Sequence, residues 1–211
     1  MFFIYFFQVQ SAVYNEYISC MQVKSFTQIK DKLIDKLKDL DPRLSYHNID
    51  HTLDVLIEAQ RIAISEKITN KRELYLLKLA ALYHDSGFLK IYDGHEEVSC
   101  SIFKKDAADF DLTNEEIKFV QNLIMVTKIT NVPHTPLEKI IRDADLDYLG
   151  RKDFSIISDL LKKELIQLNM ITDDSDWDNR QLTFLKNHHY HTKSSKDLRG
   201  PLKQKNFQSL I

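Results

Sequence analysis

A histidine and an aspartate stand side by side at the end of an apolar run in this chain. His84 and Asp85 follow the apolar residues 79–83, and such a pair is costly to bury unless something compensates it. Imidazoles and carboxylates gathered from separate helices suit a borderline divalent metal with open coordination positions. Three further segments supply such groups: residues 46–51, 94–97 and 142–146. The pattern predicts a metal-dependent hydrolase.

The spacing within these segments limits which side chains can reach one ion. His47 and His51 are four residues apart, so they share a face if both are helical. His84 and Asp85 are adjacent, so they converge only where a helix ends and the backbone turns. The Ser-Gly pair that follows them is consistent with such a turn. The two aspartates of residues 142–146 point in different directions on a helix, so we expect only one of them to reach the ion.

Helical patterns fill the rest of the chain. Capping boxes are expected at Ser25, Thr113 and Thr135, the last with a proline at the first helical position. Alternating segments long enough for a sheet are missing, and four glycines and four prolines are too few for a turn-rich all-β fold. We therefore predict an all-α, single-domain helical bundle. Its helices are expected at about 26–40, 49–63, 71–85, from 95 onward, 113–128, 135–145, 153–169, 177–188, and in a short segment before the C-terminus.

Length and composition are ordinary for one globular domain. The chain has 211 residues, with 43% apolar and 28% charged side chains. A formal net charge of −2 gives no electrostatic reason to expect a nucleic-acid polymer as partner. Cys20 and Cys100 lie far apart, so we expect free thiols in the cytoplasm, with Cys100 half-buried on a helix.

The N-terminal residues are expected to lie outside the domain. Residues 1–7 are apolar but too short to span a bilayer. They also lack the basic flank and cleavage site of a signal peptide, so no membrane association is expected. We assign residues 1–24 to an N-terminal extension and 25–211 to the domain. Residues 1–20 are either an upstream extension or a mis-assigned start.

The order of the chemical segments resembles that of the HD-domain metal-dependent phosphohydrolases. The resemblance rests on Tyr46-His47-Asn48-x-x-His51, on residues 80–87, and on Asp143-Ala144-Asp145-Leu146. It covers roughly residues 44–150, about half of the chain. The first of these segments also resembles the first site of cyclic nucleotide phosphodiesterases. The resemblance implies an HD-type helical bundle with a catalytic divalent ion.

The resemblance also implies the metal ligands, which would be His51, His84, Asp85 and Asp145. Two imidazoles and two carboxylates leave room on the ion for water, whose pKa a metal lowers toward neutrality. His47 matches the position that protonates the leaving oxygen in the phosphodiesterase relatives. The ion could be Mn, Fe, Ni, Zn, Mg or Co, since all of them tolerate these ligands.

Further residues are candidates for substrate or second-metal contacts. His95 and Glu96 match a motif that binds a second ion or contacts phosphate in some relatives. Asp93 lies where nucleotidase relatives place a carboxylate near the attacking water. Cations neutralise charge in phosphoryl transfer. We therefore also nominate two cations for a phosphate oxygen and two residues for the pocket, namely Lys128, Arg43, His188 and Tyr190.

Each of these residues also has a purely structural interpretation. His84 and Asp85 could form a hydrogen-bonded core pair, and His47 could be a surface histidine that caps a helix. His95, Glu96 and the glutamate after them also form an ordinary acidic first helical turn. Asp93, Lys128 and Arg43 could be solvated charges, as could the polar tract at residues 188–191.

The sequence departs from its relatives in two places. Dinuclear members carry two further histidines after the His-Asp pair, but residues 113–128 contain none and His134 falls in a loop beside Pro133. A second site ligated fully by histidine is therefore not expected. The loop at residues 86–90 also lacks the acidic residue of the nucleotidase-type and alarmone-hydrolase-type members. This weakens both of those substrate assignments.

Three functions remain open at this stage. The first is hydrolysis of a phosphoester in a nucleotide, a cyclic nucleotide or another small phosphorylated metabolite. The second is a nucleotide-sensing binding module with little turnover, which the missing acidic residue favours. The third is a di-iron oxygenase, against which the shortage of histidines argues. The sequence leaves the substrate, the identity and number of ions, and the oligomeric state open.

Overall fold

The computed structural model describes residues 25–211, and within this range it contains α-helices and 3₁₀ turns but no β-strand. The all-α prediction is therefore confirmed. The expected extension at 1–24, its alternative start and Cys20 lie outside the described residues. The helices are α2 (Phe26–Leu37), α3 (Ile49–Ser65), α4 (Lys71–Tyr83), α5 (His95–Asp106), α6 (Asn114–Met125), α7 (Pro136–Asp145), α8 (Phe154–Gln167), α9 (Asp174–Asn187) and α10 (Lys193–Gln208), and the 3₁₀ turns are η1 (Ser86–Leu89), η2 (Ala107–Asp109) and η3 (Asp147–Gly150).

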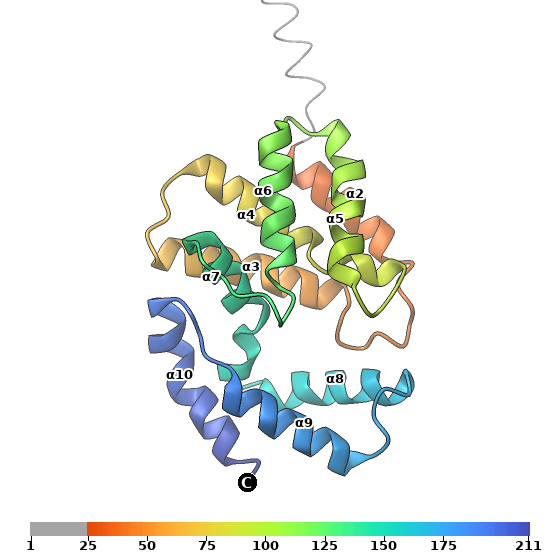
Figure 1. The fold of residues 1–211 in the computed structure, drawn as a ribbon, viewed down its shortest axis with the longest axis vertical. Coiled ribbons are helices and arrows are strands. Elements are labelled where there is room, and N and C mark those ends of the chain that lie inside the picture. Colours follow the sequence, from red (N-terminus) through yellow and green to blue (C-terminus); the bar gives the residue numbers. More distant parts are fainter. Residues whose placement is uncertain (1–24) are drawn as a thin grey trace, which may run out of the picture.

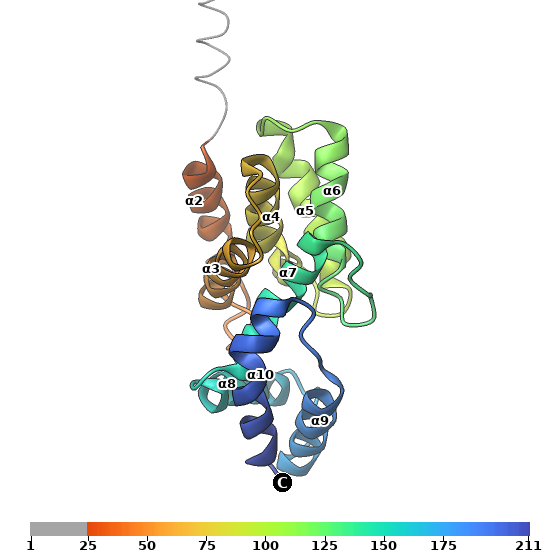
Figure 2. The same cartoon turned by 90° about the vertical axis from the view of Figure 1, so that its left-hand side faces the viewer.

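Two groups of helices make up the molecule. Figures 1 and 2 show α2–α7 in an upper bundle, with α8, α9 and α10 below it. Helix α4 is buried along most of its length, from Leu76 to Tyr83 except Lys78, which explains its nearly continuous apolar sequence. No helix between residues 25 and 211 has the length and apolarity that crossing a membrane requires.

Side-chain caps fix where the helices begin. The Oγ of Ser25 accepts a hydrogen bond from the Gln28 amide, and the Gln28 side chain accepts one from the Ser25 amide. Thr113 and Thr135 form the same capping box, so all three predicted boxes are confirmed. Each cap satisfies backbone donors that would otherwise lack a partner, worth about 1 kcal/mol.

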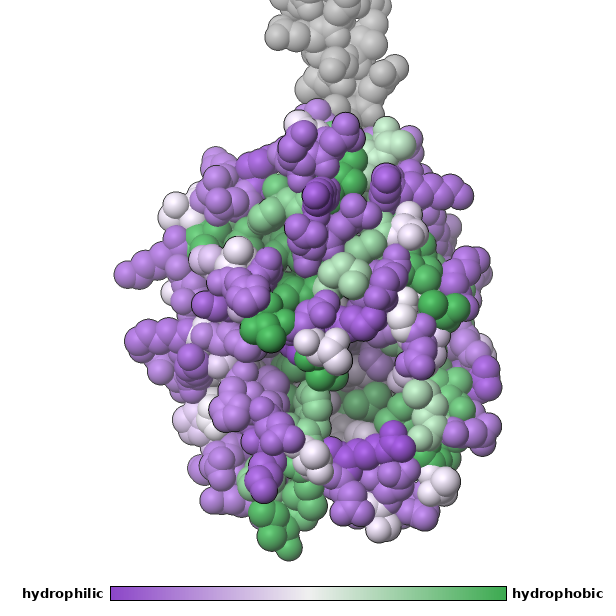
Figure 3. Space-filling view, viewed as in Figure 1, coloured by the Kyte–Doolittle hydropathy of each residue, from purple (hydrophilic) through white to green (hydrophobic). Residues whose placement is uncertain are grey.

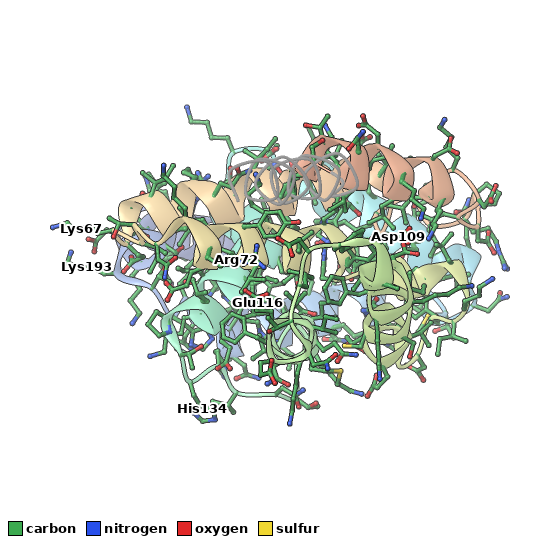
Figure 4. All side chains as sticks on the ribbon, turned by 90° about the horizontal axis from the view of Figure 1, so that it is seen from above. Lys67, Arg72, Asp109, Glu116, His134 and Lys193 are labelled. Atoms are coloured by element: carbon green, nitrogen blue, oxygen red, sulfur yellow. The ribbon has the colours of Figure 1, made fainter. Side chains whose placement is uncertain are left out.

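Ion pairs fasten neighbouring helices to one another. At the start of α4, Arg72 reaches Glu116 of α6 through two short contacts of 2.6 and 2.7 Å, and Figure 4 shows the two residues side by side. The same figure places His134 at the edge of the molecule, where it is exposed in a loop as the sequence indicated.

The C-terminal helices differ from the sequence prediction in extent. Helix α9 begins at Asp174, three residues before the predicted start at 177, because the Asp173 side chain caps it. Helix α10 is not short but has 16 residues. Asp147, which is fully buried, holds it in place by pairing with Arg199 of α10 at 2.8 Å and with Arg61 of α3 at 2.8 Å. Tertiary pairing thus extends a helix that its polar sequence did not reveal.

Candidate metal centre and its cavity

The His-Asp pair lies where helix α4 ends, as its spacing required. The last helical residue is Tyr83, His84 caps the helix, and the backbone then enters η1 directly after Asp85. The Nδ1 of His84 donates to the carbonyl oxygen of Ala81 at 2.8 Å. This bond fixes the proton on Nδ1, so Nε2 is the nitrogen that faces the other groups and would bind a metal.

Two other helices bring their ligands to the same point. His51 lies in the first turn of α3, whose start is fixed by Asn48. Asp145 is the last residue of α7. The Nε2 of His51 lies 3.3 Å from the Nε2 of His84 and 3.3 Å from an Asp145 oxygen. His51, His84 and Asp145 therefore offer ligand atoms within 4.8 Å of one another.

Asp85 completes the set. Its Oδ2 lies 3.3 Å from the Nε2 of His51 and 3.2 Å from that of His84, yet this buried oxygen has no hydrogen-bond partner. Such a carboxylate oxygen is costly to bury uncompensated. Bonds of about 2.0–2.2 Å to a central ion give ligand separations of this size. The residues therefore fit a divalent cation, and all four predicted ligands converge.

The pKa values of the four groups shift toward their charged forms, because the imidazoles and the carboxylates stabilise each other. Burial disfavours charge on His51, but the carboxylates of Asp145 and Asp85 outweigh this and raise its pKa to about 9. The same competition raises the pKa of His84. Although burial opposes it, the imidazoles lower the pKa of both carboxyls. A metal bound here would take the place of protons on these imidazoles as the positive charge that faces the carboxylates.

His95 faces the other oxygen of Asp85. Its Nδ1 donates to the Tyr92 carbonyl at 2.9 Å, which leaves Nε2 at 3.4 Å from Asp85 Oδ1 and 3.7 Å from Glu96. Gly87 makes this approach possible, because a Cβ at this position would lie 1.9 Å from the His95 carbonyl oxygen. His95, Glu96 and Asp85 could hold a second ion beside the first.

His47 is paired with a residue from the C-terminal helices. Its Nδ1 lies 2.5 Å from an oxygen of Glu164 in α8. Glu164 is fully buried and also accepts from the amides of Tyr46 and His47 and from the Tyr92 hydroxyl. The carboxylate orients the imidazole and leaves Nε2 of His47 as the nitrogen for proton exchange. The alternative, a surface histidine that caps α3, does not describe this geometry, because Asn48 caps that helix.

This geometry agrees with the comparison with known families. Residues 48–147 match the family model of the HD domain. These residues, just under half of the chain, are similar to the HD domain. The match assigns this part of the chain to a superfamily whose members are mostly metal-dependent hydrolases. It spans the four converging ligands, so the resemblance recognised in the sequence is confirmed. Comparison with curated proteins and with solved structures gives no significant match.

A cavity of about 340 Å³ opens beside the HD domain's ligands. Asp85, Asp145, His47, His95 and Glu96 line one end of it. Its other end is lined by residues of η3, α8 and α9, which lie beyond the matched range. The cavity has the size of a small-molecule site.

Three predicted site residues lie away from this cavity. Asp93 is exposed in the loop before α5. Lys128 pairs with Glu97 at 2.6 Å, and Arg43 pairs with Asp41 at 2.6 Å. None of these three lines the cavity, and both cations are held by carboxylates close to them.

The late histidine tract is divided between two roles. His188 lies with His189 and His191 around a second cavity of about 730 Å³, which shares part of its wall with the first. Tyr190 instead is buried, and its hydroxyl lies 3.3 Å from the Leu146 carbonyl. Asp143, the aspartate that does not reach the ligands, accepts from the backbone of residues 191 and 192 and so anchors the start of α10.

Several residues of the site were missed in the sequence. Glu164 shares a helical face with Phe154, Ile157 and Leu161, so a carboxylate on an otherwise apolar stripe was an available signal. Phe88 was also missed. Its ring stacks on those of His47 and His95, with centroid separations of 4.3 and 3.9 Å. The remaining missed residues form the cavity wall or support His47: Tyr92, Trp177, Arg180, Gln181 and Phe184.

Proposed function

We propose that this protein is a metal-dependent phosphoesterase. One observation carries the proposal: the Nε2 atoms of His51 and His84 lie 3.2–3.5 Å from each other and from carboxylate oxygens of Asp85 and Asp145, and the buried Asp85 oxygen there lacks a hydrogen bond. A divalent ion at this position would supply Lewis-acid activation of water and charge neutralisation at the phosphoryl group.

The residues around this point divide the remaining work. Hydrolysis forms a bond between a water oxygen and phosphorus and breaks the ester P–O bond. His47, held by Glu164, carries a proton on Nε2 for the leaving oxygen. His95 and Glu96 line the same end of the cavity and can orient the phosphoryl group or hold a second ion. Phe88 covers the rings of His47 and His95 on one side and keeps water from that face.

A sensor with little turnover is the second candidate. It is favoured by the positions of Lys128 and Arg43, which are both paired with neighbouring carboxylates rather than directed to the cavity. A site poor in cations stabilises a phosphoryl transition state less. A sensor would be stabilised by a ligand that it leaves chemically intact.

The test begins with chelator-treated protein reloaded with Mn²⁺. We expect the reloaded protein to hydrolyse a generic phosphomonoester or phosphodiester, and Asp145→Asn to abolish both metal binding and turnover. Asp50→Asn is the matched control, because Asp50 is exposed on α3. If the reloaded wild-type protein binds Mn²⁺ but hydrolyses neither class of ester, the result contradicts the proposal and favours the sensor.

A further inference from the structure

The cavity beside the metal ligands changes character along its length. Its far end is lined by apolar side chains of η3, α8 and α9. Figure 3 shows the molecule hollowed between the upper bundle and the lower helices, with hydrophobic residues around the hollow. The wall includes Leu149, Phe154, Leu161, Leu165, Trp177 and Phe184.

Three polar side chains at this wall are already engaged. The Thr127 hydroxyl donates to a carbonyl of the preceding turn at 2.8 Å. Gln181 donates to Ser158 of α8. Arg180 is bound by Asp176 at 2.8 Å. Recognition of a nucleobase needs polar partners for its edge. The wall instead presents surface that gains by excluding water.

The charge around the cavity also disfavours a polyanionic ligand. Among the described residues, Arg180 is the one lysine or arginine that lines the cavity. Burial, followed by the charge of Lys203, lowers the pKa of His188 in the adjoining cavity to about 3, so this imidazole is neutral. Arg142 there donates to the carbonyls of residues 126, 127 and 129. A diphosphate or triphosphate would find few cations beyond the metal.

We infer that the organic part of the substrate is a hydrocarbon, so that the enzyme cleaves the phosphate ester of an aliphatic or aromatic alcohol. The phosphoryl group lies at the metal ligands and the hydrocarbon lies against the wall of η3, α8 and α9. The inference rests on the proposed function, since it names the substrate class of the same site. A cavity of about 340 Å³ accommodates a small organic group.

Trp177 gives a direct readout of the cavity. It is the single tryptophan of the chain and lies in the cavity wall, buried to 7% exposure. Ligands that enter the cavity therefore change its emission, whether or not they are hydrolysed. We would titrate Mn²⁺-loaded protein with n-alkyl phosphonates of two, four, six and eight carbons, which are not hydrolysed.

Chain length is the discriminating variable. Burial of one methylene is worth about 0.8 kcal/mol, so we expect binding to tighten about fourfold per added methylene until the cavity is filled. The kcat/KM for release of phosphate from the matching n-alkyl phosphates should rise in parallel. Nucleoside monophosphates and cyclic nucleotides should be poorer substrates than hexyl phosphate.

Substitutions of two neighbouring residues on α8 distinguish an effect on the cavity wall from an effect on the helix as a whole. Leu165 lines the cavity and is half-buried, whereas Ile166 is 43% exposed and does not line it. Leu165→Asn should flatten the dependence on chain length mainly through KM. Ile166→Asn makes the same chemical change and should retain the wild-type dependence.

The outcomes distinguish the two claims. Hydrolysis that is independent of chain length, or that favours nucleotides, overturns the inference while the proposed function stands. Chain-length-dependent emission changes without hydrolysis of any ester support the hydrocarbon site and refute the phosphoesterase. If neither hydrolysis nor a change in Trp177 emission is observed, both claims are refuted.

Discussion

Replacing Glu164 by glutamine removes the carboxylate charge that faces His47 and leaves the volume of the side chain nearly unchanged. Glu164 has no exposed surface, and each of its oxygens takes two donors. Oε2 accepts from the Tyr46 amide at 2.8 Å and the His47 amide at 3.0 Å. Oε1 accepts from His47 Nδ1 at 2.5 Å and the Tyr92 hydroxyl at 3.0 Å. An NH₂ group at the Oε2 position would face two backbone N–H donors, whereas at the Oε1 position it would face the Tyr92 hydroxyl, which can accept, and His47 Nδ1, which accepts only without its proton.

The hydrogen bonds that the variant loses determine how far its free energy of unfolding falls. The amide can keep its carbonyl oxygen on the two backbone N–H groups, so the main loss is the charged hydrogen bond to His47, and Glu164→Gln should lower the free energy of unfolding by about 1–3 kcal/mol. For a domain of this length the melting temperature falls by roughly 2–4 °C per kcal/mol. Urea unfolding followed by circular dichroism measures the change. Asp159→Asn removes an exposed carboxylate from the same helix and should stay within about 0.5 kcal/mol of wild type.

The pH dependence of the difference in unfolding free energy between wild type and Glu164→Gln tests this arrangement of hydrogen bonds. Burial raises the pKa of Glu164, but His47 and the backbone amides outweigh it, so the pKa lies below the ordinary value of 4.5. The ionised carboxylate therefore stabilises the fold fully above pH 4.5, and this contribution is lost as the pH falls through the lowered native pKa. The difference between wild type and variant should shrink only in acid. A difference below about 0.5 kcal/mol at pH 7, or one that grows on acidification, refutes the arrangement.

Three further predictions concern the ion, the turn and the C-terminal helix. Because the pKa of His51 is raised to about 9, pairing of its charged form stabilises metal-free protein fully below pH 6.5 and is lost as pH rises through about 9. Mn²⁺ affinity should therefore increase over that range, and calorimetry in buffers of different ionisation enthalpy should show proton release at pH 7. Gly87→Ala should cost at least about 1–3 kcal/mol and weaken Mn²⁺ binding, because its Cβ meets backbone of residue 95. Gly200→Ala, with nothing within 4 Å, should be neutral or stabilising in thermal melts. Asp147→Ala leaves Arg61 and Arg199 with Glu58 as their remaining buried carboxylate and should lower the free energy of unfolding by about 1–3 kcal/mol, with early proteolysis in α10.

The parts of the site that were predictable are those encoded by short-range spacing. Asn48 caps α3 three residues before His51, and the end of α4 falls beside His84 and Asp85, so local rules placed three ligands. The two-residue spacing of the aspartates predicted that only one of them reaches the other ligands, and the resemblance identified that one as Asp145, which lies with His51 and His84. Capping boxes are equally local, which explains why all three were found in the sequence.

The parts that were not predictable depend on contacts between distant segments. Glu164 lies 118 residues from Tyr46 in the sequence and meets it only because α8 packs beneath the bundle. Lys128 and Arg43 were nominated by charge alone, and a carboxylate beside each one decides where it points. The length of α10 follows from the buried pairing of Asp147, not from its own polar sequence.

The ion-binding residues and the cavity wall come from different parts of the chain. The ligands lie between residues 48 and 147, the range that matches the HD domain. The apolar wall and the partner of His47 come from η3, α8 and α9, beyond that range. In the proposed enzyme, short motifs on α3, α4 and α7 would set the metal chemistry, whereas helices that these motifs do not constrain would set the contacts to the organic group. Two chains with the same ligands and different helices at 154–187 would bind the same ion and act on different esters.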